Sequence, residues 1–193
     1  MNTHDREKYL VHAMNLGFSN AADSFSKLLR TTMKVINSNS VLLAPSARYA
    51  FLSEEQGDLY VLVTKIIGEV TGKSFLILNE SEAKEIFNSL NGSKENNLQE
   101  AFLLEIDNIL SASVISKLAE AFQVEIYGDV PRLMKLNAKD LDELVHGDFD
   151  PRDPQNMVFS NVSFQFDAGD HIHPQFIWKI SHKIFDLTPS AKT

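Results

Sequence analysis

The sequence predicts an α/β domain of the α+β type, in which two pseudo-symmetric αβ repeats share one mostly antiparallel sheet with two long helices packed on it. Three observations support this fold class. Two stretches place apolar residues at helical spacing, and short β-branched and aromatic runs between turn signals indicate strands. A shift of 93 residues also lays the first helical stretch on the second. We therefore expect a single domain over residues 1–193, with repeats at about 8–95 and about 97–187 and a flexible tail at 188–193.

The first half is expected to begin with a long helix and to end with a shorter one. Apolar residues from Leu10 to Leu29 recur at helical spacing. The turn signal Thr71-Gly72 separates two apolar runs that look like strands. The predicted elements are a helix at 8–30, a short β segment at 33–36, a polar loop at 37–40, strands at 58–68 and 73–79, and a helix at 80–90.

The second half repeats this order. An apolar stripe from Leu103 to Ala121 predicts a long helix, and Asn137 and Gly147 bracket a shorter one. The predicted elements are a helix at 98–122, a strand at 123–127, a turn at Gly128-Asp129, a helix at 138–146, a loop at 148–156, and strands near 157–166 and 176–184.

The repeat is clearest in the two long helices. The 93-residue shift lays residues 9–16 on residues 102–109 and pairs Asn15 with Asn108. Any two amphipathic helices look somewhat alike, but a shared Asn between matching apolar flanks favours a true repeat. Neither unit has enough strands to enclose its own core, so we expect one continuous sheet around a pseudo-two-fold axis.

Composition excludes several classes of function. The chain has no cysteine, which rules out disulfides, thiolate nucleophiles and Cys-ligated metal. Its formal net charge of -8 gives no basic footprint for nucleic acid. The N-terminus lacks the apolar region of a secretory signal, and no apolar run is long enough to span a membrane. We therefore expect a cytoplasmic protein without a nucleic-acid or membrane partner.

One face of the second long helix carries the candidate site. Residues three and four apart share a helix face, so Ala101, Glu105, Asn108 and Ala112 lie together, away from the apolar stripe. This places a carboxylate beside a carboxamide, with small residues above and below. On spacing alone, this pattern is more typical of an ordinary solvated helix face, as most Glu/Asn pairs are.

A family resemblance favours the functional interpretation. Glu105, Asn108 and Pro131 fit the spacing Glu-x2-Asn-x22-Pro. This pattern resembles the signature of the CheC/CheX/FliY family of chemotaxis phosphatases. The run of small residues after Asn15, at 15–22, is similar to the one that follows the first-site Asn in CheC-like chains. The resemblance covers roughly residues 8–187.

The resemblance implies an activity and a role for each residue. Such proteins hydrolyse the aspartyl phosphate of a CheY-like response regulator by inserting a helix that positions the attacking water. By this resemblance Asn108 orients the water, Glu105 pairs with a lysine of the regulator, and Pro131 shapes the loop beside the helix. The supporting positions Ala101 and Ala112 keep the surface open to a partner. The regulator supplies Mg²⁺, so no cofactor of the protein's own and no metal site are expected.

The sequence departs from the family pattern at two places. Ala101 stands where family members usually carry Asp or Ser, which removes a polar contact. In the first half, His12 replaces the Glu and Ser38 replaces the Pro, although Asn15 remains. We therefore expect the first-half site, His12 and Asn15, to be degenerate, with Asn15 in a structural or partner-contact role.

Two other clusters carry weaker signals. His171 and His173, with Asp170 before them and His182 further on, could ligate a metal, or could simply form a loop that leads into a strand. The acidic loop at 148–153 lacks the Gly and the terminal Glu of an EF-hand and is expected to be solvated.

The sequence thus leads to one principal prediction and two alternatives. The principal prediction is a phosphatase acting on a phosphorylated CheY-like receiver domain in chemotaxis or two-component signalling. The first alternative is a non-catalytic adaptor of the same fold that binds a receiver, which Ala101 favours. The second is a structural subunit related to FliY. An accessory chemotaxis protein could be a further partner, and an exposed sheet edge would allow a homodimer.

Overall fold

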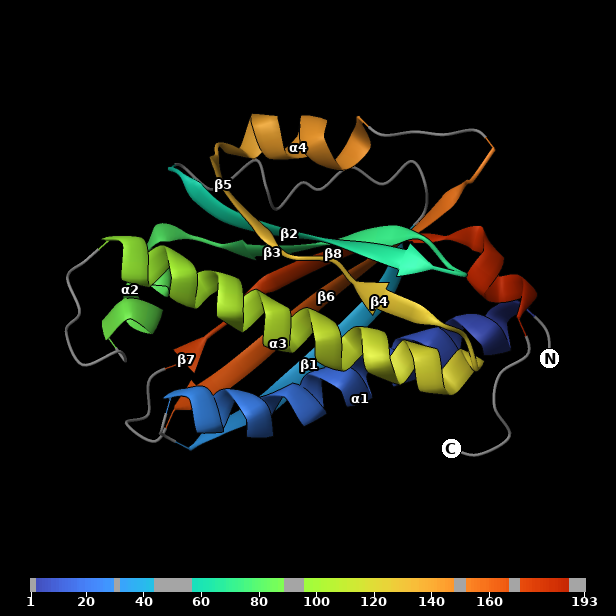
Figure 1. Cartoon of the computed structure of the whole chain (residues 1–193), viewed down its shortest axis with the longest axis horizontal. Coiled ribbons are helices and arrows are strands. Elements are labelled where there is room, and N and C mark those ends of the chain that lie inside the picture. The colour runs from blue at the N-terminus through green and yellow to red at the C-terminus, as the bar shows by residue number, and fades with distance from the viewer. Residues whose placement is uncertain are drawn as a thin grey trace.

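Two long helices lie on one face of an antiparallel sheet (Figure 1). The computed structural model describes residues 3–29, 32–43, 57–88, 96–147, 152–166 and 171–187. Helix α1 is Thr3–Leu29 and helix α3 is Asn96–Phe122. Each has 27 residues, and their first residues are 93 apart (96 − 3), the same shift that aligns their sequences.

Eight strands of the described chain form the sheet, and every pairing among them is antiparallel. The path runs β1-β6-β8-β3-β2-β4, with β5 paired to β2 and β7 paired to β6. The strands are β1 (Met33–Leu43), β2 (Leu59–Gly68), β3 (Gly72–Leu78), β4 (Ile126–Gly128), β5 (Arg132–Leu136), β6 (Gln155–Phe166), β7 (His171–Ile172) and β8 (Gln175–Ser181).

The order of the strands has the symmetry that the repeat predicts. Strands β3 and β8 pair at the centre, β2 and β6 flank them, and the strands that follow α3 and α1 form the two edges. The bounds of β1, shifted by 93, fall on residues 126 and 136 (33 + 93 and 43 + 93), where β4 begins and β5 ends. The predicted α+β fold class is therefore confirmed. The bounds of the two repeats, at 8–95 and 97–187, stay a prediction.

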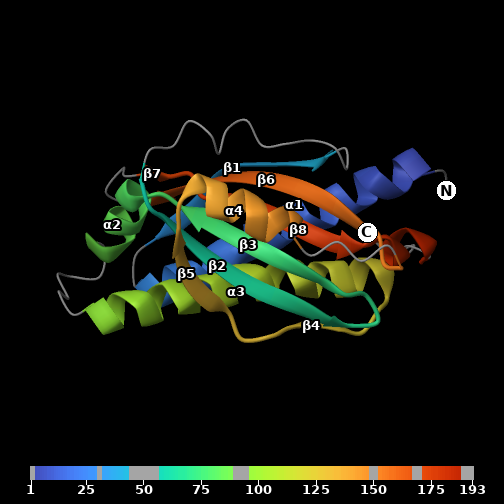
Figure 2. The same ribbon diagram turned by 90° about the horizontal axis from the view of Figure 1, so that it is seen from above.

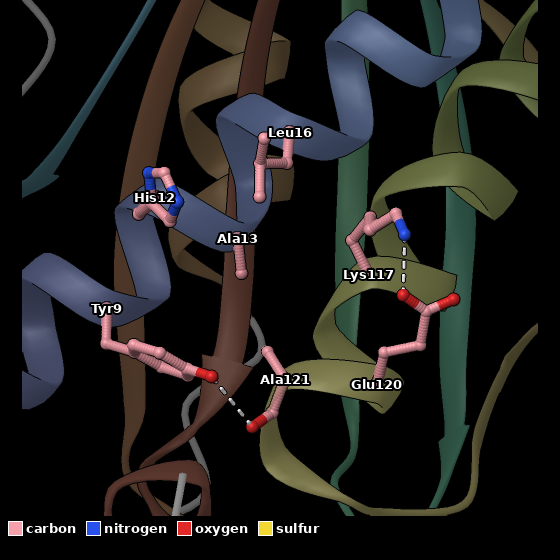
Figure 3. Close-up of a pocket in the computed structure, with 7 residues that line it drawn as sticks. All are labelled: Tyr9, His12, Ala13, Leu16, Lys117, Glu120 and Ala121. Atoms are coloured by element: carbon pink, nitrogen blue, oxygen red, sulfur yellow. Dashed lines mark hydrogen bonds and ion pairs between the residues drawn. The ribbon is translucent and has the colours of Figure 1, made fainter. Parts of the chain in front are cut away.

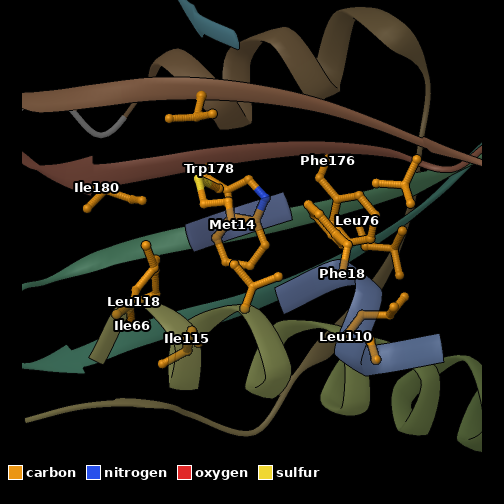
Figure 4. Close-up of a cluster of buried hydrophobic side chains, with 14 of the residues drawn as sticks. Met14, Phe18, Ile66, Leu76, Leu110, Ile115, Leu118, Phe176, Trp178 and Ile180 are labelled. Atoms are coloured by element: carbon orange, nitrogen blue, oxygen red, sulfur yellow. The ribbon is translucent and has the colours of Figure 1, made fainter. Parts of the chain in front are cut away.

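The main core lies between the sheet and the two long helices. Met14 and Phe18 of α1 point toward Trp178 and Phe176 of β8 (Figure 4), and the ring centroids of Phe18 and Phe176 are 4.8 Å apart. The apolar stripe predicted for the second helix, from Leu103 to Ala121, is buried. Burial of these side chains turns the apolar side of both helices toward the sheet.

A smaller core lies on the other face of the sheet. Helix α4 (Ala138–His146) covers that face, as Figure 2 shows, and buries Leu141 and Val145 against β2, β3 and β8. As predicted, Asn137 caps this helix by accepting a hydrogen bond from the Asp140 amide. Helix α2 (Glu80–Asn88) follows β3, and a 3-10 helix (His182–Asp186) follows β8.

Several sequence predictions for the strands are wrong, including the end of the strand expected near 176–184, because β8 ends at Ser181. The loop predicted at 37–40 belongs to β1, which continues past a register shift between Val35 and Asn37 to Leu43. Polar residues are accommodated there because β1 is an edge strand, so Asn37 and Asn39 face solvent.

Strand β5 is missing from the prediction, and the strand expected at 123–127 begins only at Ile126 and includes Gly128. β5 was not recognised because its side chains include two cations and it is only partly buried. Of these, Lys135 pairs with Glu100 of α3 and lies 5.0 Å above the ring of Tyr60. The tail at 188–193 lies outside the described residues.

The close crossing of the two long helices depends on Gly17. A Cβ atom added there would lie 2.5 Å from the Cα of Val114 on α3. We expect Gly17→Ala to lower the free energy of unfolding by about 1–3 kcal/mol, although alanine favours helix, because the helices must move apart. Urea denaturation measures this, with Ser24→Ala on the exposed side of α1 as the control. Unchanged stability of the glycine variant would contradict the close packing.

Candidate functional site

An open pocket of about 270 Å³ lies between α3 and the segment that joins β4 to β5. Figure 1 shows α3 running beside these strands. The pocket is lined by Ala101, Leu104, Glu105, Asn108, Gly128, Asp129, Val130 and Pro131. The structure thus brings together four of the five predicted site residues, although Pro131 comes from a separate part of the chain. The fifth, Ala112, is exposed on α3 one turn further along and is not among the described residues that line the pocket.

The two polar side chains of the helix wall are exposed to solvent. Glu105 and Asn108 lie three residues apart on α3, opposite the buried stripe. The described part of the chain gives neither side chain a hydrogen bond or an ion pair. A carboxylate and a carboxamide without intramolecular partners can both be offered to a docking molecule.

The opposite wall is a short loop held by β2. The Asp129 amide donates to the Lys65 carbonyl oxygen at 2.8 Å, and the Val130 amide donates to the Asp129 carboxylate at 2.8 Å. Pro131 is buried, whereas Val130 is 78% exposed and projects from the wall. The loop interrupts the strand that would otherwise continue from β4 into β5, and this interruption opens the pocket.

Sequence reasoning missed a buried carboxylate beneath the site. Asp107 is fully buried, and its two oxygens accept hydrogen bonds from Thr64 at 2.6 Å and from Ser111 at 3.0 Å. Ser111 also lies 3.2 Å from the hydroxyl of Ser74. Burial raises the pKa of Asp107 to about 6, and the two hydrogen bonds only partly offset that rise. The available signal was its position on the apolar stripe, three residues before Leu110.

The first half forms an equivalent groove of about 520 Å³ between α1 and β1. Four of the α1 residues that line it, Lys8, Val11, His12 and Asn15, lie 93 positions before Ala101, Leu104, Glu105 and Asn108. Unlike Asn108, Asn15 is engaged within the protein. Its side-chain oxygen accepts a hydrogen bond from Ser40 at 2.9 Å, and Ser40 lies 2.7 Å from Ser160. Ser38, at the proline position, is part of the continuous strand β1.

A third groove, of about 210 Å³, separates the two long helices (Figure 3). Tyr9 crosses it from α1 and donates to the Ala121 carbonyl oxygen at 3.4 Å, while Lys117 pairs with Glu120 on α3. His12 lies at its edge. This groove does not include Glu105 or Asn108, and three of its four polar lining side chains already have partners.

The histidine cluster has local partners. His171 forms the two-residue strand β7, and its ring stacks on His173 with centroids 6.2 Å apart. His173 Nδ1 lies 2.8 Å from the Ser163 hydroxyl, and His182 lies beside Asn156. Within the described ranges, no group of three or more His, Asp or Glu residues could hold a metal ion.

Asp153 of the acidic loop is attached to the sheet. Asp153 accepts hydrogen bonds from Thr71 and Ser181, which tie the loop to the ends of β3 and β8. Asp148, Asp150 and Asp170 lie outside the described residues.

The architecture, two long helices on a symmetric antiparallel sheet, matches solved structures of one group of proteins. FliY of Thermotoga maritima is similar with a TM-score of 0.66 and 16% identity, over 96% of this chain and 94% of that one. The FliM middle domain of H. pylori is similar with a TM-score of 0.59 and 10% identity, over 96% of this chain and 99% of that one. The chemotaxis protein CheX of Vibrio vulnificus is similar with a TM-score of 0.53 and 13% identity, over 89% and 98%.

The chain therefore has the CheC/CheX/FliY fold, and the resemblance found in the sequence is confirmed at the level of the fold. No family model matches the sequence, and no curated protein sequence matches it. In the parts of the chain that the structure describes, none of the helices has the length and apolar character needed to cross a membrane.

The raised pKa of Asp107 predicts a pH dependence of stability. The carboxyl group of Asp107 binds its proton more tightly in the folded protein than in the unfolded chain. Above about pH 6 the group is ionised in both states, and its buried charge lowers the free energy of unfolding. As the pH falls from about 6 toward 4, the folded protein takes up the proton and the free energy of unfolding rises. The groups that hydrogen-bond to the carboxylate are the hydroxyls of Thr64 and Ser111. We expect the free energy of unfolding of the wild type, relative to Asp107→Asn, to rise by about 2 kcal/mol between about pH 7.5 and about pH 4.5.

Urea denaturation of both proteins at the two pH values measures this difference. The asparagine keeps the shape of the side chain but does not titrate, so the contributions of other groups cancel. A difference that is independent of pH would show that Asp107 has an ordinary pKa.

Proposed function

We propose that the protein is a phosphatase that hydrolyses the aspartyl phosphate of a CheY-like response regulator. The observation that carries this proposal is the pocket in which unpartnered Glu105 and Asn108 face a loop shaped by Pro131. These are the three residues of the sequence signature, and they lie in a fold that CheX and FliY share. On this proposal the protein acts in the cytoplasm and needs no cofactor of its own.

The charge of the pocket fits a substrate that brings its own cations. Its lining contains two carboxylates, Glu105 and Asp129, and no basic residue. Such a surface repels free phosphate and small phosphate esters, because nothing in it neutralises their charge. A receiver domain supplies Mg²⁺ and a lysine beside the phosphoryl group, and these compensate both the phosphoryl oxygens and the carboxylates of the pocket.

Hydrolysis of the aspartyl phosphate then requires little from this protein beyond the correct placement of the attacking water. Hydrolysis joins a water oxygen to phosphorus while the bond from phosphorus to the aspartate oxygen breaks, and the aspartate leaves as a carboxylate. The transition state is loose, so orientation of the water and stabilisation of charge supply most of the rate. The Asn108 carboxamide can accept a hydrogen bond from the water and donate one to a phosphoryl oxygen. Glu105 pairs with the lysine of the receiver and fixes the docked pose.

One feature favours the alternative of a non-catalytic receiver-binding adaptor. Ala101 lines the pocket but has no polar side-chain atom. If the missing contact is needed to hold the water, the surface would dock a receiver without hydrolysing its phosphate. FliM middle domains, which have a similar fold, include one solved in a complex with FliG, so the fold also serves protein binding.

The decisive experiment compares two asparagines at equivalent positions of the two halves. We expect Asn108→Ala to slow phosphate release from a phosphorylated receiver by about 100-fold or more, because the water loses its orienting group. Asn15→Ala should leave the rate within about two-fold, because Ser40 already engages that side chain. A wild-type rate in Asn108→Ala would disprove the assignment.

A binding measurement separates the phosphatase from the adaptor. The affinity of the wild-type protein for a receiver carrying beryllofluoride as a phosphate mimic is measured beside the decay of the phosphorylated receiver. Binding together with faster decay supports the phosphatase. Binding together with unchanged decay at stoichiometric protein would favour the adaptor.

A further inference from the structure

Asp107 is an unusual residue to find on the buried side of α3. It is fully buried and, among the described residues, makes no ion pair, so its charge is balanced only by the hydroxyls of Thr64 and Ser111. Burying a carboxylate costs more free energy than burying an apolar side chain of similar size. The presence of Asp107 in the core is therefore not explained by its contribution to the free energy of unfolding.

The other half of the molecule shows that the fold does not require it. The residue 93 positions before Asp107 is Met14, and the residue 93 positions before Ser111 is Phe18 (107 − 93 and 111 − 93). Both are fully buried and pack in the main core. Helix α1 is thus held on the sheet by apolar contacts at the positions where α3 has a hydrogen-bonded carboxylate. This difference between the helices coincides with a difference between the two sites. The Asn15 side chain accepts a hydrogen bond from Ser40, whereas the described residues give the Asn108 side chain none.

One hydrogen bond of Asp107 joins α3 to the part of β2 that also holds the opposite wall of the pocket, and the other comes from Ser111 within α3. Thr64 donates to Asp107, and the carbonyl oxygen of the next residue, Lys65, accepts from the Asp129 amide. Thr64 is paired with Ser74 of β3, which lies within hydrogen-bond distance of Ser111. The helix wall and the loop wall are therefore attached to neighbouring residues of one strand.

We propose that Asp107 is a positioning residue that sets the rotation and height of α3 over β2, and thereby the placement of Asn108 and Glu105 opposite the loop at Asp129–Pro131. The proposal rests on the proposed phosphatase function for its consequence in catalysis. Apolar contacts tolerate small sliding and rotation of a helix, whereas hydrogen bonds of fixed length and direction do not. A displacement of about 1 Å at a positioning group can lower a rate by about 100-fold.

The test replaces Asp107 by the residue that the other half uses. Asp107→Met copies Met14 and removes a buried charge, so the variant should be at least as stable as the wild type at neutral pH. We expect kcat for the phosphorylated receiver to fall by about 10- to 100-fold, because the water held by Asn108 tolerates little displacement. KM and the affinity for the beryllofluoride-bound receiver should change by less than about three-fold, because an exposed ion pair between Glu105 and a flexible lysine tolerates a small shift of the helix. Ser116→Ala, on the exposed side of α3, should change none of these quantities.

A second variant tests the same proposal if the methionine variant does not fold. Thr64→Val removes one of the two donors at nearly constant volume and should lower kcat in the same direction. A role in stability alone would lower the amount of folded enzyme and leave kcat per folded molecule unchanged. A folded Asp107→Met or Thr64→Val protein with the wild-type kcat would overturn the proposal.

A measurement on the free protein separates this proposal from the proposed function. Amide chemical shifts and nuclear Overhauser contacts between α3 and residues 129–131 should change in Asp107→Met and stay constant in Ser116→Ala. If the wild type does not accelerate decay of the phosphorylated receiver, the phosphatase proposal fails, and these contacts alone decide whether Asp107 positions the helix. Unchanged contacts in the methionine variant would show that it does not.

Discussion

Burial of the apolar stripe of α3 determines which of its side chains can meet a partner. The side chains of Leu103, Ile106 and Leu110 are buried against the sheet, so the residues on the opposite side of the helix must face solvent. Glu105 and Asn108 occupy that side. Their exposure is therefore a consequence of core packing, and any change that rotates the helix would move the site as well. The close contact of Gly17 with α3 and the anchoring of Asp107 act on this same rotation.

The two halves show how one architecture can support two different surfaces. Each long helix faces the strand that follows it, and the same four helix positions line a pocket in each half. In the first half the strand is continuous, and Ser40 reaches the side chain of Asn15. In the second half the strand is interrupted between β4 and β5, and the described residues give the Asn108 side chain no hydrogen bond. The two sites therefore differ in their strands as well as in their helices, where His12 stands at the position of Glu105.

The helices could be predicted from the sequence because they depend on local spacing, whereas the site signature was identified through its resemblance to a family. The stripe from Leu103 onward has a helical period, and Glu105, Asn108 and Pro131 form a pattern that needs no knowledge of contacts. Strand β5 and the second part of β1 could not be predicted in this way, since their polar side chains are accommodated by the position of these strands at the sheet edges and, for Ser40, by hydrogen bonds to Asn15 and Ser160. Asp107 was missed for a related reason: Ser111 lies one turn further along the same helix, but the partner on the sheet, Thr64, is identified only when β2 is placed beneath α3.

The acidity of the site limits what the protein itself can contribute to a reaction. A pocket with two carboxylates and no basic residue in its lining cannot stabilise the negative charge of a phosphoryl group. On the proposed function, the partner must supply all the positive charge, and this protein can add only orientation. Orientation is effective only when the orienting group is held rigidly. Such a protein would therefore gain more from a buried anchor such as Asp107 than from further charged groups in the pocket. The position of Asp107, the one buried carboxylate among the described residues, beneath the site is consistent with this.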